Sequence, residues 1–232
     1  MNTNIARIVQ SSNSGCLYMM NGNYEEAIAL FRNSVRMTKE VLNQSRLMNI
    51  PRPHHHEILF EFRDTLKPLP TVTSWASSGD NNNISADKNN TFISRGVIVI
   101  VQSNPLDLSV LNLCKLSIVT IYNMAVANHM AGLQNRDIKK LKHALEYYEV
   151  AYKLQCQEPL STTSNNRHSH ILSILNNAGA IYRLLNEHDK SNMFFRDLLS
   201  KLSFLKETGH VEESWDRWNG MWGNILLLVN YV

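Results

Sequence analysis

The chain has 232 residues, of which 44% are hydrophobic and 19% charged. That composition excludes a disordered or fibrous protein and indicates a folded chain with a sizeable core. The formal net charge is +3 at pH 7, which excludes the concentrated positive charge of a dedicated nucleic-acid-binding protein. The length allows one large domain or two small ones, and we expect a single domain over 1–232.

The first elements are two helices joined by a tight turn. Apolar and small residues recur every three or four positions over 5–20, which predicts an amphipathic helix. Asn21-Gly22-Asn23 then favours a turn, because Gly and Asn tolerate a left-handed backbone. A second helix is expected from about 24 to 43. A connection this short predicts an antiparallel hairpin of helices.

Residues 47–110 have a different pattern, which predicts a small β-hairpin insertion. Pro51 and Pro53 end the preceding helix. The segments EILFEF (57–62) and GVIVIVQ (96–102) are rich in apolar, β-branched and aromatic residues, as strands are. Between them, residues 74–93 are polar and rich in Asn, so we expect a disordered loop there.

Helical periodicity resumes near 107–111 and continues to the end of the chain. We expect helices over about 111–130, 136–155, 170–185 and 190–205, with Gly132 near the first intervening turn. A last amphipathic helix, about 211–230, carries Trp215, Trp218 and Trp222 on one face. Such a helix typically caps the exposed end of a helical stack. An aromatic stripe for a partner or a second copy is the alternative.

One spacing recurs in these helix pairs. Intervals of 3, 4, 2, 3 and 4 residues separate six positions of the first pair, and the same intervals recur in the last pair. The six positions are Gly15, Tyr18, Gly22, Tyr24, Ala27 and Phe31 in the first pair, and Gly179, Tyr182, Asn186, His188, Ser191 and Phe195 in the last. A middle pair has Ala125, Asn128 and Gly132, then Ala144, Tyr148 and Ala151, with about seven extra residues between its two helices.

This pattern resembles the tetratricopeptide repeat, a helix–turn–helix unit of 34 residues. The resemblance covers about 8–42, 116–156 and 169–205. The segments YNMAVANH and ILNNAGAIY are also similar to segments of algal tetratricopeptide-like proteins. The resemblance implies a mainly α fold of three helix pairs plus a C-terminal helix, with small residues allowing close approach and Phe31, Tyr148 and Phe195 filling the space. His188 and Asn186 depart from the family's usual turn.

The resemblance also implies a concave surface lined by first-helix residues, which would bind a peptide or helix. Candidate peptide-binding residues on that surface are Asn123, Asn176, Asn177 and Arg183. A well-known site of the family grips a C-terminal carboxylate with Lys, Asn and Arg. At the matching positions this chain has Ser12, Cys16, Asn123, Ser173 and Asn177. Only Asn123 fits, so we expect no carboxylate clamp.

Other chemical signals are weak. His54 and His56, like His168 and His170, form pairs without a third ligand, so we expect no metal and no cofactor. The basic residues Arg136, Lys139, Lys140 and Lys142 fit a solvated helix start. Catalytic motifs are absent. The chain is therefore predicted to be a non-enzymatic adaptor or scaffold for a protein or peptide. A self-associating structural unit, or a metal- or nucleic-acid-linked regulator, are the alternatives.

The expected compartment follows from the cysteines and from apolar runs. Cys16, Cys114 and Cys156 lie far apart without a CxxC motif, which indicates reduced, buried thiols in the cytosol or nucleus. The segment MNTNIARIVQ lacks the apolar run of a secretory signal. The longest apolar stretch, NILLLVN, is too short to span a bilayer. We expect no membrane partner.

Overall fold

The computed structural model describes residues 2–47, 60–64, 97–101, 110–157, 165–208 and 221–225. Its contacts divide the chain into two compact units, Met1–Leu66 with Arg95–Thr162 and Lys67–Ser94 with Thr163–Val232. Unit 1 contains α1 (Asn2–Met20), α2 (Tyr24–Leu47), β1 (Phe60–Asp64), β2 (Val97–Val101), α3 (Val110–Asn135) and α4 (Ile138–Gln157). Unit 2 contains α5 (Asn165–Leu184), α6 (His188–Glu207) and a helical segment at 221–225. The single domain stays a prediction.

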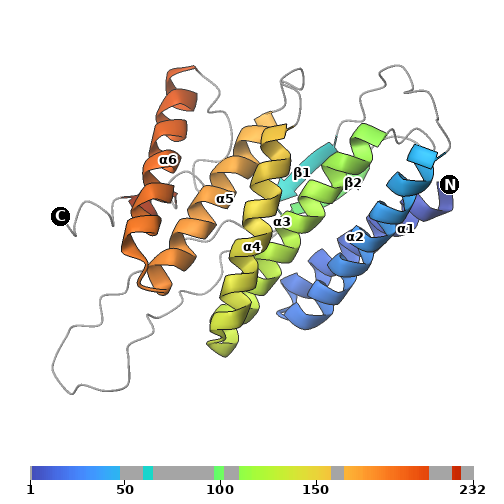
Figure 1. The fold of residues 1–232 in the computed structure, drawn as a ribbon, viewed down its shortest axis with the longest axis horizontal. Helices are drawn as coiled ribbons and strands as arrows, with labels where there is room; N and C mark the ends of the chain where they lie inside the picture. The colour runs from blue at the N-terminus through green and yellow to red at the C-terminus, as the bar shows by residue number, and fades with distance from the viewer. Residues whose placement is uncertain are drawn as a thin grey trace. The chain divides into compact units, whose positions relative to one another are not determined.

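The described chain is mainly helical, as predicted, and its helices form consecutive pairs. In unit 1, α1 packs on α2, α2 on α3 and α3 on α4, so two pairs lie side by side (Figure 1). In unit 2, α5 packs on α6. Side chains of α1 and α2 also bond to the backbone of the other helix, since Ser11 Oγ donates to Leu30 O at 2.9 Å and Ser34 Oγ to Ile8 O at 3.1 Å.

Each pair turns on one residue with a left-handed backbone. These residues are Gly22 (φ 79°), Arg136 (φ 52°) and Asn186 (φ 58°). In each turn the N–H of the next residue bonds to a carbonyl five residues earlier, as in Asn23 N–H to Tyr18 O at 3.0 Å. This bond is typical of a helix that ends in a left-handed residue. Gly132, expected near a turn, instead lies inside α3.

The extra residues of the middle pair lengthen its helices. Gly15 lies seven residues before the turn residue Gly22, whereas Ala125 lies eleven before Arg136. On the other side, Ala27 lies five residues after its turn residue and Ala144 eight after. The added residues therefore form about one further turn in α3 and in α4, because one helical turn takes 3.6 residues. The sequence predicted them between the helices.

Glycines bring the paired helices close together. A Cβ at Gly15 would lie 2.6 Å from Phe31 Cε1, and one at Gly179 would lie 3.0 Å from Phe195 Cε1. Both aromatic rings are buried. The hydroxyl of Ser191 donates to Gly179 O at 2.9 Å, so α6 reaches the backbone of α5 itself. The first and last pairs thus share one packing arrangement.

The middle pair packs around different side chains. A Cβ at Gly132 would lie 2.7 Å from Leu141 Cδ2. The Tyr148 ring lies 5.9 Å from Tyr122 and 6.2 Å from His129, measured between centroids. Tyr122 and His129 lie about one turn on either side of Ala125 along one helix face. Tyr148 therefore packs on the face of α3 that carries Ala125, the position that corresponds to Gly15.

The insertion forms a two-stranded antiparallel sheet in unit 1. Its register runs from Phe60 opposite Val101 to Asp64 opposite Val97. The sequence predicted strands over 57–62 and 96–102, and β1 begins and ends later than expected. Strand β2 lies against α1 and α3, the first helices of their pairs. The loop predicted over 74–93 lies outside the described residues.

The predicted C-terminal helix, 211–230, is described as helix at 221–225. Met221 and Ile225 are buried there, and Trp222 is half-buried. Trp215 and Trp218 lie outside the described residues. The capping role of this helix stays a prediction.

Candidate functional site

In unit 1, the positions that would line a peptide groove bond to one another. Ser12 Oγ lies 3.2 Å from Thr120 Oγ1, and Asn123 Nδ2 donates to Cys16 Sγ at 3.2 Å. All four side chains are buried. These contacts join α1 to α3 directly. Asn123 was predicted to bind a peptide, but its amide instead donates a hydrogen bond to Cys16 within the unit.

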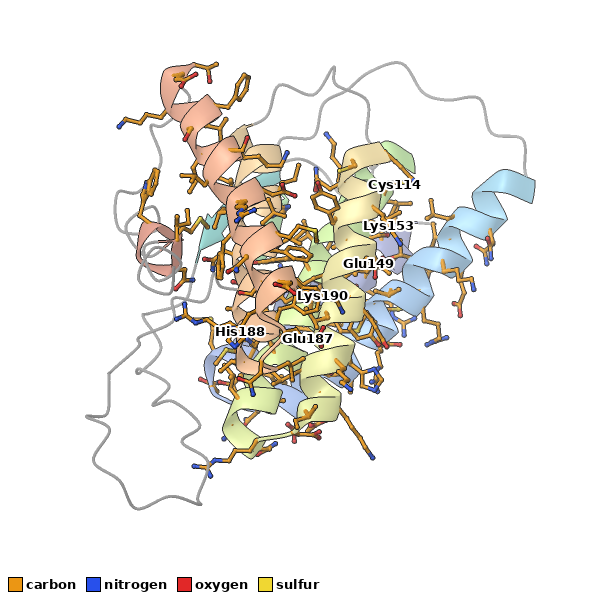
Figure 2. All side chains as sticks on the ribbon, turned by 60° about the vertical axis from the view of Figure 1, so that its left-hand side comes forward. Cys114, Glu149, Lys153, Glu187, His188 and Lys190 are labelled. Carbon is orange, nitrogen blue, oxygen red and sulfur yellow. The ribbon has the colours of Figure 1, made fainter. Side chains whose placement is uncertain are left out.

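Burial also sets the chemistry of the cysteines. It raises the pKa of the Cys16 thiol to about 12, so the thiol stays protonated and unreactive. Cys114 is half-buried at the start of α3 (Figure 2), and Cys156 is exposed. The expectation that all three are buried is wrong for these two, because both lie toward helix ends.

His129 is a buried, neutral histidine. Its ring meets the Tyr148 ring edge-on at 87°. Among the described residues, neither Nδ1 nor Nε2 has a hydrogen-bond partner. The same holds for Oδ1 of neighbouring Asn128, whose Nδ2 donates to Met124 O at 2.8 Å. Burial lowers the pKa of His129 to about 3, because an imidazolium there would be unsolvated. Burying these polar atoms without a described hydrogen-bond partner therefore lowers the stability of unit 1.

In unit 2, the predicted amides form a chain with a residue from the C-terminal segment. Asn176 Nδ2 donates to Asn177 Oδ1 at 3.1 Å, and Asn224 Nδ2 donates to Asn176 Oδ1 at 2.7 Å. Asn176 and Asn177 are both 0% exposed. The surface of α5 that the sequence assigned to a ligand is therefore in contact with the chain's own segment 221–225.

The four predicted peptide-binding residues divide between the units. Asn123 belongs to unit 1, and the other three to α5 of unit 2. Arg183 is half-buried in the last turn of α5, where a cation is favoured by the helix dipole. Of the four, the structure joins Asn176 and Asn177 by a hydrogen bond.

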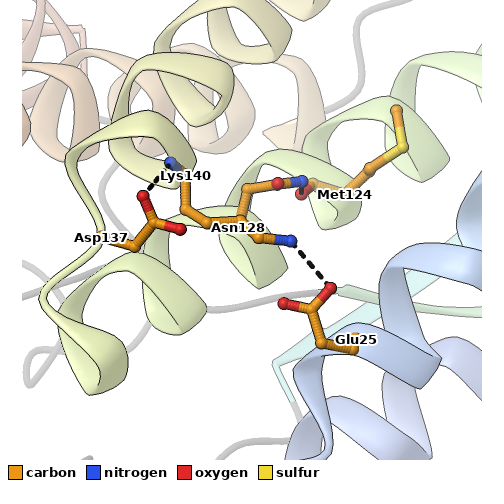
Figure 3. A network of polar contacts seen from close by, with 5 residues as sticks. All are labelled: Glu25, Met124, Asn128, Asp137 and Lys140. Carbon is orange, nitrogen blue, oxygen red and sulfur yellow. Dashed lines mark hydrogen bonds and ion pairs between the residues drawn. The ribbon is translucent and has the colours of Figure 1, made fainter.

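An ion pair links the first two helix pairs. Lys140 Nζ, in the first turn of α4, lies 2.7 Å from Glu25 Oε2, in the first turn of α2 (Figure 3). The carboxylate of Asp137 accepts the N–H groups of Lys139 and Lys140 at 2.8 and 3.3 Å. Asp137 therefore caps α4 and holds Lys140 in place. This is a structural use of the basic cluster at 136–142.

Other described ion pairs are local. Lys153 lies 2.7 Å from Glu149 along α4, and Lys190 lies 2.6 Å from Glu187 at the α5–α6 turn (Figure 2). Lys190 also lies 5.2 Å from the centroid of the Tyr182 ring. Its pKa is raised by the bond to Glu187. Such exposed contacts order the surface rather than form a reactive site.

The described residues contain neither a metal-binding cluster nor a membrane-spanning helix. Within the described ranges, no three His, Cys, Asp or Glu side chains are grouped to hold a metal ion. His54 and His56 lie outside those ranges, as does the side chain of His168. His170 is buried, which lowers its pKa to about 4. None of the described helices combines the length and apolar character needed to cross a bilayer.

Sequence reasoning missed Asn224, His129 and the Glu25–Lys140 pair. Asn224 had a signal, because it is a polar residue three positions after Met221 and directly before the apolar run ILLLV. His129 follows Asn128 in a helix segment whose other residues are mostly apolar, which marks it as buried. The ion pair had no signal, since it joins residues from two different helix pairs.

Comparison with known proteins found a family that matches part of the chain. The family model of the tetratricopeptide repeat matches residues 12–57. This match confirms the predicted resemblance for the segment that contains α2 and residues 12–20 of α1. Neither the curated proteins nor the solved structures gave a match.

Proposed function

We propose that this chain is a non-enzymatic protein–protein interaction module that binds a peptide or a helix as an adaptor or scaffold. The observation that carries the proposal is the tetratricopeptide match over residues 12–57, since such repeats typically bind protein segments. The Gly15–Phe31 contact and its counterpart at Gly179–Phe195 support it, because a repeated unit builds an extended surface.

We propose that the binding surface lies on α5. In unit 1, Asn123 donates to Cys16, so a ligand at that position would break a buried bond. On α5, the partner of Asn176 is Asn224, from a segment of five described helical residues. Displacing the segment 221–225 would leave the α5–α6 pair in place, whereas a ligand at Asn123 would break a contact between α1 and α3. Arg183 lies two turns further along α5 and would add a charge-assisted contact.

Affinity purification with mass spectrometry from the native cell tests this function. The tagged wild type is compared with Arg183→Glu and with Lys153→Glu, a charge reversal on the exposed face of α4. We expect enriched proteins that Arg183→Glu loses at least fivefold and Lys153→Glu retains. An absence of proteins enriched over an untagged control would sink the proposal. Enrichment that both variants retain would move the surface away from Arg183.

The alternative is self-association through the hairpin. Among the described residues, β1 and β2 pair with each other along one edge, and the alternative is that the other edge of either strand pairs with a second copy. Sedimentation at protein concentrations of about 1 to 100 µM, the range of typical weak interfaces, distinguishes self-association from a monomeric adaptor. A single species at the 26.6 kDa monomer mass excludes the alternative.

A further inference from the structure

The segment 221–225 presents one face to the interior of unit 2. Met221, Asn224 and Ile225 are buried, whereas Trp222 is half-buried and Gly223 is exposed. The three buried positions are spaced three and one residues apart, the spacing of one side of a helix. Asn224 contacts α5 through the 2.7 Å bond to Asn176. The segment therefore meets α5 as a short amphipathic helix.

The asparagine contact determines which helix can occupy this position. Asn176 accepts from Asn224 and donates to Asn177, so one amide is engaged on both sides. A helix with an apolar residue in place of Asn224 would leave Asn176 Oδ1 without this donor in a buried setting, which is costly. A helix shifted by one position would do the same. The Asn pair thus selects both sequence and register.

We propose that the α5 surface around Asn176 is a receptor for a short helix of the pattern apolar-x-x-Asn-apolar. Residues 221–225 are its resident ligand, and a partner protein's helix of the same pattern displaces them. The pattern is that of residues 221–225 themselves, whose Asn224 bonds to Asn176 of α5. This inference rests on the proposed function, because it names the kind of partner that the interaction module takes.

Displacement follows from the size of the resident contact. The five described residues of the segment bury three side chains, and a partner helix that carries the same anchors and makes further contacts with α5 would bury more. The resident segment competes at the high effective concentration of a tethered ligand, about millimolar for a short linker. The wild type should therefore bind an added helix more weakly than a variant whose segment has been released.

The test uses the full chain and a fluorescent peptide of residues 216–230. Ile225→Asp places a charge at a buried position and releases the resident segment. By anisotropy, we expect the peptide to bind Ile225→Asp at least tenfold more tightly than wild type. A peptide with Asn224→Leu should bind Ile225→Asp at least tenfold more weakly. Gly223→Ala is the matched control, because a Cβ there meets no atom within 4 Å.

A second measurement covers the case in which Ile225→Asp fails to fold. In the full chain, Asn224→Leu should speed amide hydrogen exchange over 170–181 at least fivefold, and Gly223→Ala should leave it unchanged. Unchanged exchange in Asn224→Leu overturns the proposal. So does equal peptide affinity for wild type and a folded Ile225→Asp, or equal binding of the two peptides.

Two further results separate this proposal from neighbouring ones. If the wild type forms a dimer that Asn224→Leu abolishes, the occupant is the segment of a second copy and the partner proposal is overturned. If native partners are captured but the peptide does not bind Ile225→Asp, the interaction function stands and the receptor assigned here does not.

Discussion

At the scale of single residues, the helix pairs depend on two glycines that meet aromatic rings. The packing at Gly15 is tighter than at Gly179, since a Cβ would lie 2.6 Å from the ring in the first case and 3.0 Å in the second. Phe31 is 0% exposed, so its ring has little room to move away. A methyl group is therefore harder to accommodate in the first pair.

Gly15→Ala should destabilise the protein by about 1–2 kcal/mol. Overpacking a buried contact costs about 1–3 kcal/mol, and the higher helix propensity of Ala returns up to about 1 kcal/mol. Urea denaturation followed by circular dichroism measures the change. Gly179→Ala should cost less, because its neighbour is further away.

Phe31→Leu supplies the control for this contact. If the ring causes the loss, adding Gly15→Ala to Phe31→Leu should cost less than adding it to the wild type. A Gly15→Ala protein as stable as the wild type would contradict the packing described here.

His129 makes stability depend on pH. Its pKa is about 3 in the folded protein and 6.5 in a free side chain. The unfolded chain therefore binds a proton at this histidine near pH 6.5, whereas the folded chain binds it only near pH 3. The free energy of unfolding is therefore unaffected by this group above pH 6.5 and falls as the pH is lowered toward 3. Between pH 8 and pH 5 this histidine should cost about 2 kcal/mol. His170 acts in the same direction, because burial lowers its pKa to about 4.

Urea denaturation at pH 8 and pH 5 checks this dependence. His129→Leu should lose less stability than the wild type over that range. At pH 8 its stability should lie within about 1 kcal/mol of the wild type or above it, because neither ring nitrogen has a partner in the part of the chain that the structure describes. A variant with the full wild-type pH dependence would show that His129 is accessible to protons when folded.

The sequence predicted small residues and aromatic rings correctly as features of helix pairing, but it could not predict every environment. Tyr18 was grouped with the packing positions and is 42% exposed, whereas Asn123, expected to face a ligand, is 0% exposed. Spacing identifies the face of a helix. It does not determine whether another element covers that face, and here α1 and β2 lie against α3.

At the scale of elements, the ends of helices were less predictable than their presence. The turn at Gly22 has Asn and Gly, residues that favour a left-handed backbone, and it was predicted. At the second turn the left-handed position is held by Arg136, a residue that seldom adopts this backbone, so the turn was expected near Gly132 instead. The hydrogen bond from Asp137 N–H to Gly132 O, at 2.9 Å, ends α3 there without help from a glycine.

The ion pair between α2 and α4 should contribute little to stability. Glu25 is 60% and Lys140 22% exposed in their side chains, so water screens the attraction. We expect Lys140→Met to cost under about 1 kcal/mol, with a Glu25→Gln/Lys140→Met coupling energy that shrinks in 1 M salt. Lys153→Met, which removes a pair within one helix, is the control. A loss of several kcal/mol for Lys140→Met would mean that the pair is far less exposed.

At the scale of the whole chain, charge argues against nucleic-acid binding. The net charge is +3 over 232 residues, and Lys140, Lys153 and Lys190 each have a carboxylate partner. We expect no saturable binding of mixed-sequence RNA at physiological salt, with a Kd weaker than about 100 µM. Fluorescence anisotropy with a labelled RNA measures it, and a Kd in the nanomolar range that survives 0.2 M salt would contradict the prediction.

The candidate site shows why function was harder to predict than fold. Asn176 and Asn177 were predicted from their place on a first helix, but their partner, Asn224, lies 48 residues from Asn176. Local periodicity carries no information about such a distant contact. The same holds for Ser12 and Thr120, which meet across 108 residues.

Glycine substitutions at the left-handed turns should raise the thermal stability of the protein. Arg136 and Asn186 have a left-handed backbone conformation. This conformation is unfavourable by about 1–2 kcal/mol for a residue with a Cβ atom, whereas glycine adopts it at almost no cost. Part of that gain is offset by the greater freedom of glycine when unfolded. Arg136→Gly should therefore raise the melting temperature by a few degrees, and Asn186→Gly by less, because Asn tolerates this backbone. Calorimetry would measure both melting temperatures. The more stable double variant would then allow the destabilising substitutions described above to be studied in a protein that remains folded.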